Sequence, residues 1–282
     1  MSSARDLKKA RSFYADLMAT ASRSSDPRLR QAFEAVPREA FMPPGPWNIL
    51  VDHYYVETPD NDPIYLYQNA LVALDIAKGI NNGEPYLHAA WIGAVSPQPG
   101  EQVCHIGAGT GYYTAMLSLL VLPDGHVTAF EIEDSLAQQA QRNLASYTNV
   151  SVTSGDATRL PIPSSDLIYV NAGVTCPPLS WLRALRPDGR LIFPWRPSET
   201  IGLALLIRRA DEGYRAQPLM GSWFIPCVGA SSLGDCRRTP DRHEAHLVAS
   251  VWPTEEREPD ETAVAIYRDL WFSSRDLQAA AT

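Results

Sequence analysis

The sequence lacks any apolar run near the ~20 residues of a membrane span, and it begins with polar and charged residues instead of a secretory signal. Its four cysteines, Cys104, Cys176, Cys227 and Cys236, match no disulfide or metal framework. Basic residues are outnumbered, 24 Lys and Arg against 32 Asp and Glu, a net charge of −8. We therefore expect a cytoplasmic protein with reduced thiols, no metal, no membrane contact and no nucleic-acid partner.

What the chain does contain is enough apolar sequence, 45% of 282 residues, for a sizeable core. Residues 1–63 are expected to form an N-terminal cap. It begins with a helix, marked by an apolar stripe from Leu7 to Met18, and a second helix capped at Asp26, and it continues as irregular covering structure. Residues 64–210 form the expected core. Residues 211–282 form an extension. Within it we expect strands at Ser222–Val228 and His246–Trp252 and a short helix at Ala263–Leu270.

The most informative segment is V-C-H-I-G-A-G-T-G at residues 103–111. A buried strand ends in glycines at alternate positions, and an apolar helix from Tyr112 follows. The predicted cofactor-binding residues of this loop are Gly107, Ala108, Gly109, Thr110 and Gly111. Tyr112 stands where a dinucleotide fingerprint needs its last glycine. The G-x-G-x-G spacing resembles the first motif of class I S-adenosylmethionine-dependent methyltransferases, which implies that cofactor.

Polar side chains follow the next predicted strands. Glu131 ends the strand His126–Phe130, 20 residues after Gly111, where a carboxylate can accept both ribose hydroxyls, and Ile132 beside it is also assigned to the cofactor. The methyltransferase pattern places the adenine contact at Asp156 and Ala157. Asn171 ends the strand 166–172 and is equally compatible with a turn. With a fifth strand at 190–194, the order predicts an α/β fold with a doubly wound, mostly parallel sheet, Rossmann-like.

Two further motifs narrow the resemblance. V-P-R-E-A-F-M-P at residues 36–43 and G-I-N-N-G-E-P-Y-L-H-A at 79–89, followed by the glycine loop, resemble the protein-L-isoaspartate O-methyltransferase family over about residues 30–195. The resemblance implies that His88 helps to hold the cofactor. The alternative is a helix histidine packed under the loop.

The chain departs from that family at the acceptor loop. Asn81, Asn82 and Gly83 replace the Thr-Ile-Ser triplet that receives the isoaspartyl carboxylate, so the hydroxyl tied to methyl transfer is absent. His105 replaces the acid usually found before I-G-x-G. The asparagine amides can donate to an acceptor carboxylate, or they can satisfy loop backbone groups instead. Glu84 or His88 is available as a base for another acceptor.

We therefore expect a methyltransferase that modifies a carboxylate of a peptide or small metabolite and does not repair isoaspartate. The alternatives are a small-molecule N- or O-methyltransferase, a tRNA adenine methyltransferase and a non-catalytic cofactor-binding partner protein. The oligomeric state is left open. A Gly83→Ser substitution is expected to restore a trace of repair activity if residue 83 does not need a positive φ.

Overall fold

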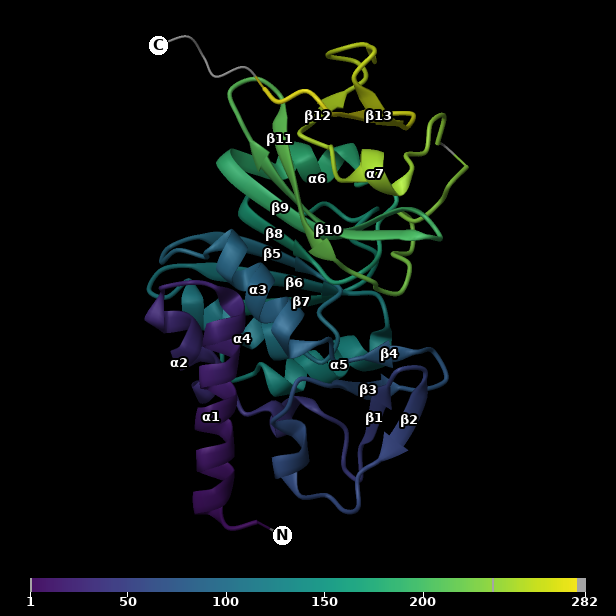
Figure 1. The fold of residues 1–282 in the computed structure, drawn as a ribbon. Coiled ribbons are helices and arrows are strands. Elements are labelled where there is room, and N and C mark those ends of the chain that lie inside the picture. Colours follow the sequence, from purple (N-terminus) through teal and green to yellow (C-terminus); the bar gives the residue numbers. More distant parts are fainter. Residues whose placement is uncertain (1, 235, 278–282) are drawn as a thin grey trace. The chain divides into compact units, whose positions relative to one another are not determined.

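The computed structural model describes residues 2–234 and 236–277 and divides into two compact units (Figure 1). Unit 1 comprises Met1–Glu101 and Ala108–Ser154, and unit 2 comprises Gln102–Gly107 and Gly155–Thr282. The chain therefore changes unit three times. One of these junctions, between residues 107 and 108, lies inside the glycine loop.

Unit 1 begins with the two expected helices. Ser3 caps the first by accepting a hydrogen bond from Asp6 N at 3.2 Å, and Asp26 Oδ1 accepts from Arg28 N at 2.9 Å at the start of the second. The helices and 3-10 turns of unit 1 are α1 (Ala4–Ser22), α2 (Pro27–Ala35), η1 (Arg38–Phe41), η2 (Pro63–Leu66), α3 (Pro85–Val95), α4 (Tyr112–Leu120) and α5 (Asp134–Asn143). Tyr14 and Met18, which belong to the predicted apolar stripe, are buried, and Ala15 is buried beside them.

A small antiparallel sheet covers part of unit 1. Its order is β2-β1-β3-β4, with β1 (Asn48–Val51), β2 (Tyr54–Glu57), β3 (Leu71–Asp75) and β4 (Ile80–Asn81). The expectation that residues 36–63 are irregular is therefore wrong for the β1–β2 hairpin. Asp52, with a φ of 56°, lies in the tight turn that lets the short runs N-I-L-V and Y-Y-V-E pair. Unit 1 also contains the parallel pair β6 (His126–Glu131) and β7 (Val150–Ser154).

Unit 2 is built on a mixed sheet with the order β13-β14-β12-β11-β10-β9-β8-β5. Its strands are β5 (Gln102–Ile106), β8 (Ser165–Val170), β9 (Leu185–Ser198), β10 (Ile201–Arg209), β11 (Tyr214–Gly221), β12 (Ser250–Pro253), β13 (Ala263–Ile266) and β14 (Leu270–Ser273), and its helices are α6 (Leu179–Ala184) and α7 (Arg242–Ala245). β5, β8 and β9 are parallel, as a doubly wound sheet requires. β10 to β14 add antiparallel pairs, which makes the sheet mixed, while the predicted core strands are parallel to one another in every pairing described here.

The extension differs from its expected elements in three places. The expected strand His246–Trp252 is confirmed only from Ser250, where β12 begins, because residues 246–249 form a turn and loop after α7 (Arg242–Ala245). Residues 222–228 follow β11 and form only an isolated bridge with Gly173. The expected helix Ala263–Leu270 is wrong, because these residues belong to the strands β13 and β14. Periodicity cannot separate a short buried strand from a helix in a run such as A-V-A-I, and pairing with β14 decides the structure here.

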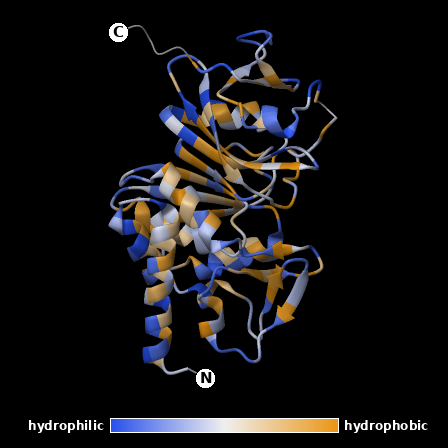
Figure 2. Ribbon diagram, viewed as in Figure 1, coloured by the Kyte–Doolittle hydropathy of each residue, from blue (hydrophilic) through white to orange (hydrophobic). Residues whose placement is uncertain are grey.

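The core of unit 2 lies on both faces of its central strands. Figure 2 shows hydrophobic residues concentrated along them, and the buried ring of Trp195 stacks on Phe272 with centroids 5.0 Å apart. The extension thus contributes to the same core as the predicted catalytic strands. Among the described residues, no helix combines the length and apolarity needed to cross a bilayer.

Candidate functional site

The glycine loop has the backbone that its sequence predicts. Gly107, Gly109 and Gly111 have φ values of 76°, 56° and 95°, all in the left-handed region that favours glycine. Ala108 N donates to Phe130 O at 3.0 Å, which ties the loop to β6. The hydroxyl of Thr110 donates to Phe41 O at 2.6 Å and is therefore committed to the protein interior.

Glu131, the last residue of β6, is held in place by backbone amides. Its Oε2 accepts from Gly109 N at 2.6 Å and its Oε1 accepts from Glu133 N at 3.0 Å. The side chain is only 6% exposed. Burial raises the pKa of Glu131, and the backbone donors partly offset that rise.

These surroundings fit S-adenosylmethionine. Each oxygen of Glu131 receives one of these amide bonds and retains capacity for a ribose hydroxyl. A Cβ built on Gly109 would meet only Leu74 Cδ1, at 3.6 Å, which leaves room for a ligand to approach the backbone. The exposed side chain of Ile132 follows directly.

His88 lies buried in α3. Its ring stacks on Tyr113 with centroids 3.7 Å apart and an interplanar angle of 20°. This is the packed histidine that the sequence left as an alternative, and its contact with the cofactor stays a prediction. A Cβ on Gly83, whose φ is 85°, would lie 2.4 Å from His88 Nε2. Gly83→Ser is therefore strained in both backbone and packing, which removes the condition on which its expected rescue depended.

The acceptor-loop side chains are engaged within unit 1. Asn81 Oδ1 accepts from Tyr55 Oη at 3.1 Å, and its Nδ2 donates to Gly79 O at 3.1 Å. Asn82 is buried. Glu84 immediately precedes α3 and accepts from Asn69 Nδ2 at 2.7 Å. No Ser or Thr occurs between β3 and α3.

Arg38 is the residue of this region whose role the sequence did not reveal. Its fully buried guanidinium donates to Leu66 O and Ala70 O, both at 2.7 Å, and to Gln68 O at 3.1 Å. Its Nε donates to Asn82 Oδ1 at 3.4 Å. The motif V-P-R was the available signal, and only the structure shows that its arginine links the loop before β3 to the acceptor loop.

In unit 2, the predicted adenine contact occupies an ordered turn. Asp156 Oδ1 accepts from Thr158 N at 2.8 Å and from Thr158 Oγ1 at 2.7 Å. The carbonyl of Ala157 accepts from Trp181 Nε1 at 3.0 Å. The half-buried carboxylate of Asp156 keeps its Oδ2, 3.6 Å from Arg159 Nε, for further contacts.

Asn171 directly follows β8 and contacts the unexpected His105. The two side chains meet at 2.9 Å, Asn171 Nδ2 to His105 Nε2. Burial lowers the pKa of His105 to about 3, so the ring is neutral and accepts this bond. Among the described residues, the buried Oδ1 of Asn171 has no hydrogen-bond partner. His105 thus orients the amide beside Gly107, where the family pattern has an acid.

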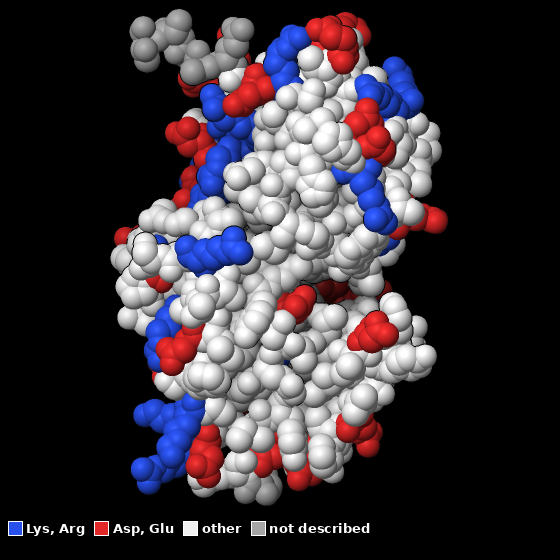
Figure 3. All heavy atoms as spheres, in the orientation of Figure 1, with Lys and Arg blue, Asp and Glu red and all other residues white. Residues whose placement is uncertain are grey.

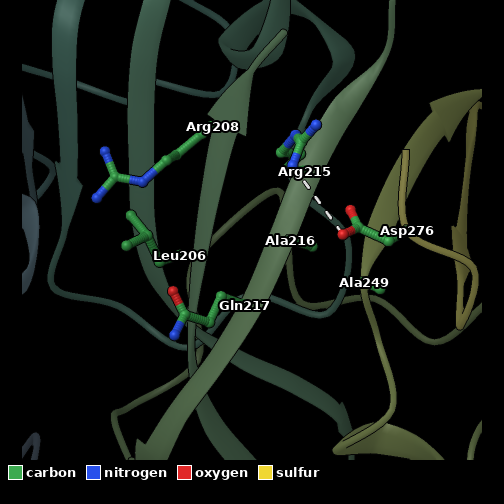
Figure 4. A pocket seen from close by; sticks show the side chains of 7 residues that line it. All are labelled: Leu206, Arg208, Arg215, Ala216, Gln217, Ala249 and Asp276. Atoms are coloured by element: carbon green, nitrogen blue, oxygen red, sulfur yellow. Dashed lines mark ion pairs between the residues drawn. The ribbon is translucent and has the colours of Figure 1, made fainter. Parts of the chain in front are cut away.

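Other surface features are less suited to this chemistry. A pocket on β10 and β11 is lined by Leu206, Arg208, Arg215, Ala216, Gln217, Ala249 and Asp276 (Figure 4). Arg215 pairs with Arg208, and Arg208 pairs with Arg190 of β9, which is opposite Leu167 near the beginning of β8. The pocket therefore lies towards the opposite end of the strands from Asn171, which follows β8. Acidic and basic side chains are interspersed on the face shown in Figure 3. The described residues include no cluster of three metal-ligating side chains.

Solved structures show the class of fold. A protein-L-isoaspartate O-methyltransferase aligns with a TM-score of 0.67 and 21% identity over 93% of this chain and 86% of that one. A beta-aspartate methyltransferase from Plasmodium falciparum, in complex with S-adenosyl-L-homocysteine, aligns with a TM-score of 0.61 and 16% identity over 77% and 97%. The fold is that of class I methyltransferases, and the predicted fold class is confirmed.

Sequence comparison identifies the family. The family model described as protein-L-isoaspartate(D-aspartate) O-methyltransferase matches residues 15–232. Similar relatives are the protein-L-isoaspartate O-methyltransferases of Methanopyrus kandleri, 32% identical over 72% of this chain and 84% of the relative, and Pelotomaculum thermopropionicum, 34% over 61% and 74%. The chain belongs to this family and is an S-adenosylmethionine-dependent methyltransferase. The predicted resemblance, enzyme class and cofactor are confirmed.

Proposed function

We propose that this enzyme methylates a carboxylate of a peptide or small metabolite and that isoaspartyl repair is not its activity. The observation that carries the proposal is the acceptor loop. The positions where the family has two hydroxyl side chains hold Asn81 and Gly83, and no Ser or Thr lies between β3 and α3.

The chemistry asks for positioning more than for proton transfer. S-adenosylmethionine supplies a methyl group already activated on a sulfonium. A carboxylate acceptor is ionised at neutral pH, so no side chain has to remove a proton from it. Removing one hydrogen-bond donor from a reacting oxygen typically costs about 10²–10³-fold in rate. We therefore infer from the missing hydroxyl that the acceptor of this enzyme differs from isoaspartate.

Each candidate residue has a proposed part. Glu131 accepts the ribose hydroxyls, with Ile132 beside it, and Asp156 with Ala157 receives the adenine. The backbone of residues 107–111 approaches the cofactor. Asn171 presents its amide oxygen to the ligand, and His88 supports the loop from beneath. Asn81 Nδ2, which donates to Gly79 O at 3.1 Å, is the amide available to turn towards an acceptor carboxylate. Asn82, held by Arg38, and Glu84 shape the loop around it.

The test is transfer of labelled methyl groups from S-adenosylmethionine to matched peptides. One peptide carries an isoaspartyl residue, one an aspartyl residue and one only its C-terminal carboxylate, and a mixture of small carboxylic acids is tested in parallel. We expect methylation of an ordinary carboxylate and at least about a hundredfold lower kcat/KM for the isoaspartyl peptide. Isoaspartyl methylation as fast as that of a relative such as the Methanopyrus kandleri enzyme would overturn the proposal.

A loop variant sharpens the test. Asn81→Thr restores a hydroxyl in an extended strand position, where a β-branched residue is tolerated, whereas Gly83→Ser is strained. We expect Asn81→Thr to raise isoaspartyl turnover and to leave the cofactor affinity unchanged. Asn81→Val, which has the same shape without the hydroxyl, is the matched control.

A further inference from the structure

Three arginines lie directly opposite one another on neighbouring strands of unit 2. Arg208 of β10 pairs in register with Arg190 of β9 on one side and with Arg215 of β11 on the other. Directly opposed residues of antiparallel strands project from the same face of a sheet, with Cβ atoms about 4.5–5.5 Å apart. The three side chains therefore form a row of cations, which we call the arginine row, across one face of the sheet.

The arginine row concentrates positive charge. Like charges in directly opposed positions disfavour the pairing of their strands. Arg190 is only 5% exposed, and its Nη1 donates to the backbone oxygen of Asp166 at 3.1 Å. Partial desolvation and the charge of Arg190 both lower the pKa of Arg208. An anion bound at the row would offset this repulsion.

The pocket of Figure 4 lies at the arginine row. Arg208 is on one side of it, and Arg215 and Asp276 are on the other. Its volume of about 210 Å³ is smaller than the about 300–1,000 Å³ of sites that enclose drug-sized ligands. The pocket thus suits a small molecule or a single charged group.

The donors at this pocket match a phosphate group. A guanidinium can donate two parallel hydrogen bonds to phosphate oxygens, and Gln217, opposite Leu206 in register, adds an amide donor. A phosphate monoester presents three acceptor oxygens and nearly two negative charges, enough to engage both exposed arginines, whereas one guanidinium already satisfies a carboxylate.

The acids near the row leave it accessible to such a ligand. Asp276 Oδ2 lies 4.0 Å from Arg215 Nη1, beyond hydrogen-bond distance, so a phosphate can replace this weak ion pair. The carboxylate of Asp166 accepts from Arg186 Nη1 at 2.9 Å and is engaged there.

We propose that the arginine row binds the phosphate group of a small phosphorylated molecule, held by Arg208 and Arg215. The pocket lies wholly in unit 2, towards the end of the strands opposite Asn171, so its ligand is distinct from the cofactor. The net charge of −8 disfavours a long polyanion such as a nucleic acid. This inference does not depend on which acceptor the enzyme methylates.

The experiment measures binding to the full chain by calorimetry at constant ionic strength. The probe is phenyl phosphate, and benzoate is the carboxylate with the same ring. Phenyl phosphate should bind at least about tenfold more tightly than benzoate. Arg208→Gln and Arg215→Gln should each weaken its binding about tenfold. Arg242→Gln, at an exposed position in α7, is the matched control and should leave it unchanged.

Two further variants distinguish a built site from general attraction by positive charge. Arg208→Lys keeps the charge but loses the planar pair of donors, so it should also weaken binding of phenyl phosphate. Asp276→Asn removes the acid that competes for Arg215 and should strengthen binding severalfold. Damage to the fold cannot produce that gain.

Several outcomes would overturn the proposal. They are undetectable binding at millimolar phenyl phosphate, binding no tighter than that of benzoate, an equal loss in Arg242→Gln, and weaker binding in Asp276→Asn. An oligonucleotide or a vesicle containing phosphatidic acid that binds more tightly than phenyl phosphate through the same arginines would refute a small-molecule ligand. The affinity for S-adenosylmethionine should stay at the wild-type value in every variant, and a parallel loss would contradict a separate site.

Discussion

Glu131 is a buried carboxylate placed where the proposed ligand needs a hydrogen-bond acceptor. The substitution Glu131→Gln removes charge-assisted hydrogen bonds worth about 1.5–3 kcal/mol. We therefore expect S-adenosylmethionine to bind roughly ten- to a hundredfold more weakly, as measured by calorimetry. Burial raises the pKa of Glu131. Affinity of the wild type should therefore begin to fall on acidification at a higher pH than an ordinary glutamate would give.

The pH dependence of cofactor affinity provides the control for Glu131→Gln. The carboxylate form binds the ribose, so affinity is highest above the raised pKa and is lost as the pH falls through it. Glu131→Gln should remove that component of the pH dependence. The same pH profile in both proteins would assign the titration to another group and contradict the ribose contact.

Gly109 has a positive φ and also faces the space proposed for the cofactor. Gly100 has a positive φ without that position, so comparing the two glycines separates backbone strain from ligand contact. A Cβ on Gly100, whose φ is 85°, would meet nothing within 4 Å, while Gly109 has a φ of 56° and faces the proposed ligand. Gly109→Ala and Gly100→Ala should each cost about 1–2 kcal/mol of unfolding free energy. Only Gly109→Ala should weaken cofactor binding. Equal affinities in a titration would remove the loop backbone from the proposed cofactor contacts.

The sequence predicts some of these residues better than others. The positions of Glu131 and of the loop glycines follow from local spacing, because a strand, a tight turn and a helix leave little freedom there. The surroundings of His105 depend on Asn171, 66 residues further along the chain, and those of Gly83 depend on how α3 folds back to place the His88 ring against it. A single sequence does not report such pairings.

Arg38 organises three backbone segments at the scale of elements. Its carbonyl partners belong to η2 and to the loop before β3, and Asn82 follows β4. Arg38→Met should leave buried carbonyls without donors, at roughly 1–3 kcal/mol each, and so lower the unfolding free energy by more than about 2 kcal/mol in a urea titration. Arg5→Met, at an exposed position in α1, serves as the control. A loss below about 0.5 kcal/mol for Arg38→Met would show that water replaces the guanidinium.

Elements were predictable where their pattern was long or capped. α2 and the strands β6 and β8 have the expected places within two residues, and α1 contains the whole expected stripe from Leu7 to Met18. The β1–β2 hairpin and the pair β13–β14 were missed because each strand has only four residues, too few for a period to show. Their stability comes from pairing partners, which the local sequence does not specify.

For the molecule as a whole, the extension is part of the folded core of unit 2. Phe272 on β14 is fully buried against Trp195 on β9. Phe272→Ala should therefore cost about 3–5 kcal/mol of unfolding free energy, measured by urea titration, while Leu247→Ala at an exposed site should cost little. A small loss for Phe272→Ala would mean that residues 233–277 are an appendage whose unfolding is separate from that of the strands before them.

The three junctions between the units constrain how this chain can be made and recombined. Unit 2 takes residues 102–107 from within the sequence of unit 1. During synthesis, β5 therefore leaves the ribosome before β8, the strand with which it pairs, and before β9, which pairs with β8. A chimera that joins unit 1 to unit 2 of a relative must exchange the six-residue segment 102–107, which contains β5, as a separate piece. With a single crossover, β5 would come from a different protein than the unit 2 strand with which it pairs.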